Sequence, residues 1–284
     1  MRKLTKEELR RAGLDYAAVL EEKTARRFLR REIPPFGGVI AALFPYYAGG
    51  EPGNLSLYAR GRDYHLLVRA RLERAAAVLG LEGAEAFVDV SPFREVALAT
   101  AGGLGEAGKN GLLVNRPLGS LFFIGELVTK EELTPLSGGL EGACTGCGLC
   151  TAVCPTAALQ GEKLLVGRCL SHITQSRTID EEQREALEKT PLIWGCDACQ
   201  LCCPANQGLG VTALPEFRSG LQSSLTAEEL AGLSEREFRR RFAGRAFTWR
   251  GVAPLKRNLA LKERGREGAT CKAPPEEGGK EPSQ

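Results

Sequence analysis

Cysteines are concentrated in the second half of this sequence, at spacings that suit metal binding. The stretch CTGCGLCTAVC holds Cys144, Cys147, Cys150 and Cys154, and a proline follows it. This is the bacterial ferredoxin pattern for a [4Fe–4S] cluster, in which three thiolates on one loop reach three corners of the cluster. In two-cluster proteins the fourth cysteine binds the other cluster. The pattern therefore predicts a second cysteine segment elsewhere in the chain.

That second segment is GCDACQLCCP, which supplies Cys196, Cys199 and Cys203 before another proline. It is one cysteine short of the first motif, and Cys169 can make up the difference. We expect the two segments to exchange ligands. Cluster one would then be held by Cys144, Cys147, Cys150 and Cys203, and cluster two by Cys154, Cys169, Cys196 and Cys199.

Two cysteines remain, Cys202 and Cys271. Cys202 could in principle replace its neighbour Cys203, whereas Cys271 has no expected role. The alternative is a pair of structural zinc sites, since two CxxC pairs can bind one tetrahedral ion. Eight cysteines in ferredoxin order with two Cys-Pro ends favour the clusters. Clusters carry electrons without acting on a substrate, so we expect the N-terminal half to hold a redox cofactor or a partner surface.

The composition is typical of a globular protein of the cytoplasm. The chain has 284 residues, of which 43% are hydrophobic and 26% charged, and its net charge is +3. No apolar run suggests a membrane span, and the charged N-terminus lacks the apolar core of a signal peptide. In a reducing cytoplasm ten cysteines are metal ligands rather than disulfides. With two histidines, most histidine-based metal chemistry is excluded.

Hydrophobic patterning predicts an α+β first half that ends near Ser137. We expect helices at 14–32, 64–80 and 93–102, and strands at 38–47, 84–90, 110–115 and 120–128. The predicted domains are 1–138, a cysteine-rich domain at 139–215, a helical segment at 216–264 with capping boxes, and a disordered tail at 265–284, which is poor in apolar residues.

Two features of the first half could carry chemistry. Asp89 closes an apolar strand, so its carboxylate either caps the next helix, as Ser91 could, or acts as a general acid whose pKa is raised by apolar surroundings. The stretch GLGEAG (103–108) matches the dinucleotide fingerprint. A helix precedes it and a strand follows it, which is the inverse of the required order. The order argues against a dinucleotide site, while a glycine-rich loop that lets the backbone approach some other cofactor closely stays open as an alternative.

The chain resembles the epoxyqueuosine reductases of tRNA queuosine biosynthesis over roughly residues 35–262. The matching stretches include YARGRDYH, VDVSPFRE, AGGLGEAGKNGLLV, GSLFFIGELVT, both cysteine motifs and the arginine-rich segment that begins at EREFRRRF. The resemblance implies a nitroreductase-like α/β domain that binds cobalamin, followed by a ferredoxin-like double-cluster domain and a short helical segment. It implies reduction of epoxyqueuosine to queuosine at the tRNA wobble position, with a buried, neutral Asp89 as proton donor.

The resemblance also suggests where cobalamin would bind. An apolar face would suit the corrin ring, and polar groups would suit its amide rim. The expected cofactor-binding residues are Asp63, Lys109, Asn110, Leu113, Ser120, Ile124, Ser171 and Asp197. For Leu113 and Ile124 plain core packing is an equal alternative, and for His65 and His172 a structural or surface role is the default.

A tRNA partner would require a local basic surface, because the net charge is small. The candidates lie in the C-terminal segment, although a solvated helix face explains them equally well: Arg239, Arg240, Arg241, Arg245, Arg250, Lys256 and Arg257. We expect a monomer that takes electrons from a low-potential donor. The chain departs from the family at VDVSP and GLGEAGKN, so a paralogue with another substrate and a non-catalytic electron carrier stay open as alternatives.

Overall fold

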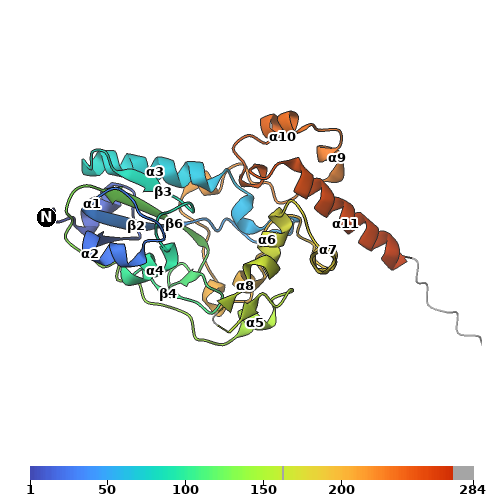
Figure 1. Cartoon of the computed structure of the whole chain (residues 1–284), viewed down its shortest axis with the longest axis horizontal. Coiled ribbons are helices and arrows are strands. Elements are labelled where there is room, and N and C mark those ends of the chain that lie inside the picture. Colours follow the sequence, from blue (N-terminus) through green and yellow to red (C-terminus); the bar gives the residue numbers. More distant parts are fainter. Residues whose placement is uncertain (162, 271–284) are drawn as a thin grey trace, which may run out of the picture.

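A four-stranded antiparallel sheet organises the first half of the molecule (Figure 1). The computed structural model describes residues 1–161 and 163–270. The strand order is β1-β2-β6-β3, and β2 and β6 pair along their whole length. The bounds are Ala17–Glu21 for β1, Gly38–Pro45 for β2, Glu85–Phe87 for β3 and Phe122–Thr129 for β6. The short strand β3 therefore forms one edge of the sheet.

Helices cover both faces of the sheet (Figure 1). On one face lies α3 (Tyr64–Leu79), which starts at the N-cap Asp63 and buries Val68 and Leu72 against the strands. On the other lies α4 (Glu95–Ala101), with Leu98 in a second apolar cluster. The shorter helices α1 (Lys6–Arg11) and α2 (Glu22–Ala25) precede them.

The expected helix at 14–32 is wrong. Residues Ala17–Glu21 form β1, and only α2 and a turn of 3₁₀ helix at Arg26–Phe28 are helical in this stretch. The run from Ala17 to Leu20 is fully buried, which a strand covered on both faces requires and an amphipathic helix does not. The other expected elements of the first half are present with shifted ends.

The glycine-rich stretch forms a hairpin. Strand β4 (Glu106–Ala107) pairs with β5 (Leu113–Val114), so the stretch does not adopt the strand–turn–helix order of a dinucleotide site. Gly105 has a φ of +135°, and a Cβ there would lie 2.6 Å from the Val114 carbonyl oxygen. Only glycine allows the backbone that close approach.

The cysteine-rich part consists of short elements that pack against the segment after β2. The Ser56 amide donates to the Trp194 carbonyl and the Ile193 amide donates to the Asn54 carbonyl, so the backbones of the two parts are hydrogen-bonded to each other. The elements are α5 (Leu149–Ala152), β7 (Leu159–Gln160), β8 (Lys163–Leu164), α6 (Leu170–Gln175), α7 (Glu181–Glu188) and α8 (Ala198–Leu201).

The C-terminal segment completes the first core. It contains α9 (Ala227–Leu230), α10 (Glu235–Arg241) and α11 (Val252–Thr270), and both expected capping boxes are formed. Phe238 and Phe247 join the same apolar cluster as Val68 and Trp194. Helix α11 covers 265–270, the start of the tail for which we predict disorder, and the rest of that tail lies outside the described residues. Within the described chain, no helix has the length and apolar character to cross a membrane.

Candidate active site and metal centres

Two cavities each gather four cysteines. The first is lined on one side by Lys109 and Asn110, and its cysteines are Cys144, Cys147, Cys150 and Cys203. The second has a volume of about 300 Å³, and its cysteines are Cys154, Cys169, Cys196 and Cys199. The spacing of the motifs predicts these same two groups of four. An all-thiol donor set in each cavity suits an iron–sulfur cluster, whose ligands are thiolates.

The second cavity opposes the ionisation of its own thiols. Burial raises the pKa of Cys196 to about 11 and that of Cys199 to about 12, and other nearby cysteines add to both shifts. Burial also acts against Cys154, but backbone amides, including that of Ala158 at 3.3 Å from the sulfur, outweigh it and lower its pKa. Four thiolates are stable here only around a strongly positive centre, such as the iron of a cluster.

The first cavity is tied to the glycine-rich hairpin. Glu106 accepts a hydrogen bond from the backbone amide of Cys144 at 2.9 Å. The side chain of Asn110 accepts from the Leu112 amide at 3.2 Å and donates to the Cys199 carbonyl at 3.5 Å. Because Asn110 lines both cavities, it lies between the two expected clusters.

The two remaining cysteines have different positions. Cys202 is half buried, and its thiol contacts the Cys199 carbonyl oxygen at 3.6 Å. It lines neither four-cysteine cavity, whereas its neighbour Cys203 lines the first. The geometry thus favours Cys203 as the ligand. Cys271 lies outside the described residues.

Asp89 occupies a strained backbone position beside the sheet edge. Its φ is +59°, a region that residues other than glycine rarely adopt and that is often found at functional sites. Its side chain is 49% exposed, so the expectation of a buried carboxyl is wrong. The physical reason is that Asp89 follows the end of the edge strand β3, where no further strand covers it. It does not cap α4, whose N-cap is Arg94.

Two side chains from the first turn of α3 contact this carboxylate. Tyr64 donates a short hydrogen bond to Asp89 Oδ2, and His65 Nε2 lies 3.2 Å from the same oxygen. The other imidazole nitrogen, Nδ1, lies 2.8 Å from Oδ1 of Asp63. The hydrogen bonds to Asp63 and Asp89 raise the pKa of His65 to about 9, which makes it a cation at neutral pH. Burial, with Asp89 nearby, raises the pKa of Tyr64, which stays a phenol.

A stack of aromatic rings supports Tyr64 from behind. Its ring lies 4.0 Å from that of Phe123 with an angle of 3° between the planes, and Phe123 contacts Tyr46 at 4.5 Å and Phe217 at 5.6 Å. Tyr58 meets Tyr64 edge-on at 6.1 Å. The stack leaves the phenol of Tyr64 little freedom to move away from Asp89.

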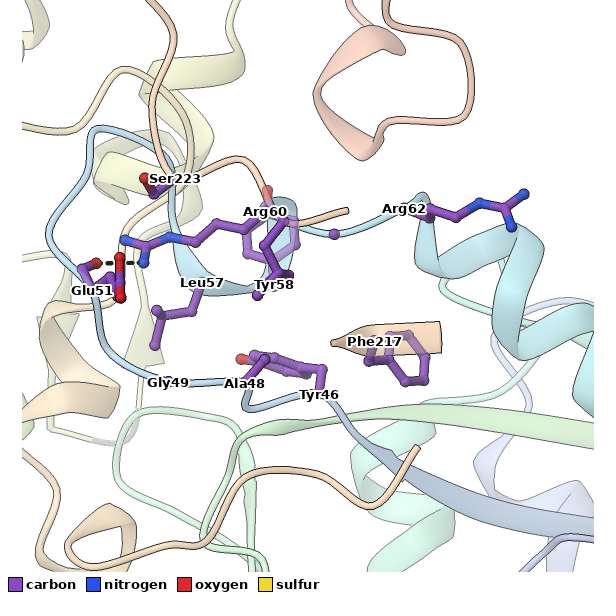
Figure 2. A pocket seen from close by; sticks show the side chains of 12 residues that line it. Tyr46, Ala48, Gly49, Glu51, Leu57, Tyr58, Arg60, Arg62, Phe217 and Ser223 are labelled. Carbon is purple, nitrogen blue, oxygen red and sulfur yellow. Dashed lines mark hydrogen bonds between the residues drawn. The ribbon is translucent and has the colours of Figure 1, made fainter. Parts of the chain in front are cut away.

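A pocket of about 180 Å³ lies on the far side of these rings (Figure 2). Tyr46, Tyr58 and Phe217 form its aromatic wall. The Arg60 side chain runs to the Glu51 carbonyl, to which it donates at 2.5 Å, whereas Arg62 points away from the pocket. Since Tyr58 also lines the second cysteine cavity, one ring separates this pocket from the expected cluster.

Two of the expected cofactor-binding residues are committed to contacts within the protein. Both carboxylate oxygens of the buried Asp197 accept hydrogen bonds, at 2.5 Å from the Ser56 hydroxyl and at 2.9 Å from the Leu57 amide. Ser120 accepts hydrogen bonds from the side chains of Gln200 and Asn206. Both residues therefore fasten the cysteine-rich part to the sheet domain.

The other expected cofactor-binding residues fall into three places. Asp63 pairs with His65 below Asp89, and Lys109 and Ser171 line the first and second cysteine cavities respectively. Leu113 is 2% exposed and packs in the second apolar cluster. Ile124 and its neighbour Phe123 are the two residues of β6 that are not fully buried.

The basic residues of the C-terminal segment divide into two groups. Arg245, Lys256 and Arg257 donate to backbone carbonyl oxygens and so hold the fold together. Arg250 stacks at 3.8 Å on the ring of Trp249, which is 54% exposed. The arginines of α10 are exposed: Arg239, Arg240 and Arg241. Among them, Arg239 pairs with Glu235 and Arg241 donates to the Glu229 carbonyl.

Comparison with known proteins matches this arrangement to one family. Residues 26–90 match the profile described as epoxyqueuosine reductase QueG, DUF1730, and residues 143–206 match the 4Fe-4S double cluster binding domain. The epoxyqueuosine reductase of Lactococcus garvieae is 40% identical over 219 residues, which cover 73% of this chain and 60% of that protein. That of Pseudomonas aeruginosa is 41% identical over 224 residues, covering 74% and 60%. The chain is a relative of the epoxyqueuosine reductases.

Solved structures extend the likeness to the fold. The epoxyqueuosine reductase of Streptococcus thermophilus superposes with a TM-score of 0.76 at 25% identity, over 92% of this chain and 80% of that one. An epoxyqueuosine reductase bound to a tRNA-Tyr stem loop superposes with a TM-score of 0.79 at 23% identity, over 93% and 82%. The expected α+β fold with a double-cluster domain is confirmed. The chain spans about 60% of the length of these curated relatives.

Proposed function

We propose that this protein reduces epoxyqueuosine to queuosine in the wobble position of tRNA. One observation carries the proposal: a carboxylate with two attached proton donors lies in the same molecule as two four-cysteine cavities. Electrons and protons are what the reaction consumes. Conversion of an epoxide to an alkene breaks both C–O bonds, takes up two electrons and two protons, and releases water.

The cysteine cavities would supply the electrons. Each would hold one [4Fe–4S] cluster, and a cluster of this type passes one electron at a time. Two clusters therefore match the two electrons of the reaction. When bound, cobalamin supplies a low-potential cobalt centre able to open the epoxide ring. The part-exposed apolar side chain of Ile124 on β6 suits the corrin face, and Lys109 and Asn110, which line the first cysteine cavity, suit its amide rim.

Asp89 would supply the proton to the epoxide oxygen as the C–O bond breaks. Its half-exposed position lets it contact a substrate from solvent. The proton lies in a shared network rather than on an isolated carboxyl, because the imidazolium of His65 and the phenol of Tyr64 both face Asp89 Oδ2. His65 passes its proton to the Asp89 carboxylate, which delivers a proton to the epoxide oxygen, and Asp63 keeps the imidazole oriented through Nδ1.

A tRNA substrate fits the exposed arginines of α10 and the Trp249–Arg250 stack, since phosphates and unstacked bases are recognised by such side chains. One relative was solved with an epoxyqueuosine-modified tRNA stem loop in place. The structure of the Bacillus subtilis enzyme has its catalytic aspartate loop swung out of the active site. We infer that the Asp89 loop is the counterpart of that segment.

The test is conversion of an epoxyqueuosine-containing anticodon stem loop by anaerobically purified protein with iron, cobalamin and a low-potential reductant. We expect loss of one oxygen atom from the modified nucleoside, measured by mass spectrometry. Asp89→Asn keeps the shape but not the proton, and should slow the reaction by about 10²- to 10⁴-fold. Glu85→Gln, which changes an exposed carboxyl on β3 before the Asp89 loop, serves as the control and should leave the rate unchanged.

Full activity of Asp89→Asn would contradict the acid role. A protein that holds about eight irons per chain but binds no cobalamin and leaves the stem loop unchanged would instead be an electron carrier.

A further inference from the structure

Two glutamates lie beneath the Asp89 loop, on the face of the sheet opposite to Tyr64. Glu126 is on β6, where its Cα pairs with that of Phe87 two residues before Asp89. It is 0% exposed. Glu95 is the first residue of α4 and is partly buried. The mechanism proposed above uses neither carboxyl group.

Three oxygens of these two side chains have no hydrogen-bond partner among the described residues: Glu95 Oε1, Glu126 Oε1 and Glu126 Oε2. Arg30 and His65 both lower the pKa of Glu95. No cation within residues 1–161 and 163–270 is found to lower that of Glu126. A buried carboxylate without a partner is costly, and two such groups side by side cannot both stay ionised.

The neighbours of the pair belong to the catalytic loop. The backbone amide of Asp89 lowers the pKa of Glu95, and the Ser91 hydroxyl lowers that of Glu126. Ser91 accepts from the Phe93 amide at 3.0 Å, which leaves its hydroxyl hydrogen free for Glu126. Two polar groups of the loop are thus available to the two glutamates.

A single proton on Glu126 would give a hydrogen-bond partner to all three of the unpaired carboxylate oxygens. Glu126 then donates its O–H to Glu95 Oε1 and accepts from Ser91 with its other oxygen, while the second oxygen of Glu95 accepts from the Asp89 amide. We propose, on the basis of the function inferred above, that Glu126 is a neutral carboxylic acid and that the Glu126–Glu95 pair positions Asp89 in its strained loop.

The titration of the pair agrees with this arrangement. Burial raises the pKa of Glu126 well above its usual value, and Glu95 adds to the effect, so both favour the neutral acid. Burial and the charge of Asp89 raise the pKa of Glu95 to about 7, while the Asp89 amide, Arg30 and His65 oppose the shift. As the pH falls below 7, Glu95 takes up a proton and holds the Asp89 amide less well, so the loop should loosen.

The first test is infrared spectroscopy of the full-length protein with its clusters at pH 8. We expect a carboxylic-acid carbonyl band in the wild type that disappears in Glu126→Gln and persists in the matched control Glu85→Gln. This measurement needs no substrate, so it stands or falls independently of the proposed activity. An identical spectrum for wild type and Glu126→Gln would overturn the proposal.

The second test follows the loop itself by amide hydrogen exchange of residues 88–94, corrected for intrinsic rates. Gln can donate and accept like the neutral acid, so Glu126→Gln should keep wild-type protection, whereas Glu126→Leu and Glu95→Gln should lose about 10- to 100-fold, the factor for a hydrogen bond to a charged group. The kcat for stem-loop reduction should likewise stay near the wild-type value in Glu126→Gln and fall in Glu126→Leu and Glu95→Gln, with KM unchanged in all three. Equal losses in Glu126→Gln and Glu126→Leu would show that Glu126 acts as an ion and sink the proposal.

Discussion

At the scale of single residues, the candidate site depends on the partners of Asp89 more than on its burial. The carboxylate is half exposed, yet a phenol and an imidazolium both face one of its oxygens. Asp63 anchors the imidazolium from the other side. A solvent-facing acid of this kind can meet a large substrate and still be resupplied with a proton.

The raised pKa of His65 links this network to stability. The folded-state pKa is about 9 and the reference value is 6.5. The stabilisation is therefore fully present below pH 6.5 and is lost as the pH rises through about 9. Since the side chain is 40% exposed, we expect a contribution of only about 1 kcal/mol.

Thermal or urea unfolding of wild type and His65→Gln measures this contribution. The wild type should be more stable at pH 6, and the difference should vanish above pH 9. His172→Gln, which removes the exposed second histidine, is the control for losing an imidazole outside this network. A difference that is constant from pH 6 to pH 10 would mean that His65 is not held as a cation.

At the scale of elements, the site is made by the ends of three segments. The edge strand β3 delivers Asp89, the first turn of α3 delivers Tyr64 and His65, and the segment after β2 is fastened to the cysteine-rich part through Asp197. The contacts of Asp89 with Tyr64 and His65 lie within the sheet domain. The hydrogen bonds of Asp197 fix the position of the cysteine-rich part relative to that domain.

Asp197→Ala tests that fastening. It leaves the buried Ser56 hydroxyl and Leu57 amide without acceptors, which should cost about 1–3 kcal/mol for each unsatisfied group. For a chain of this size each kcal/mol lowers Tm by about 2–4 °C. Asp180→Ala, at an exposed N-cap, is the matched control and should change Tm less. Equal shifts in the two variants, measured by calorimetry of the cluster-loaded protein, would contradict the docking role.

Regular elements were predictable from the sequence, whereas contacts between distant segments were not. The strands β2 and β6 and the helix α3 were predictable because their apolar patterns are long and regular. The sequence did not predict strand β1, because a buried run of four residues is too short to show a strand period. Tyr64 and His65 were not assigned to the site because their partner Asp89 is distant in sequence, although an N-cap Asp followed by Tyr-His was a usable signal.

At the scale of the whole molecule, one apolar core runs through all three parts of the chain. Val68 of α3, Trp194 of the cysteine-rich part and Phe247 of the C-terminal segment belong to a single cluster. Asn110, from the glycine-rich hairpin, lines both cysteine cavities and so joins that hairpin to both expected clusters. Such rigid docking keeps the distances between redox centres fixed.

The most direct measurement of the central claim is the yield of a single turnover. Protein loaded with clusters and cobalamin is fully reduced, freed of reductant and mixed with an epoxyqueuosine stem loop. The two clusters hold two electrons and reduced cobalamin holds at least one more, which is enough for about one queuosine per chain. Cys154→Ser, which removes a ligand of cluster two although it lies in the first motif, should give almost none, and Cys202→Ser should give the full yield. Undiminished product from Cys154→Ser, or none from the wild type, would contradict the proposed path of electrons to the Asp89 site.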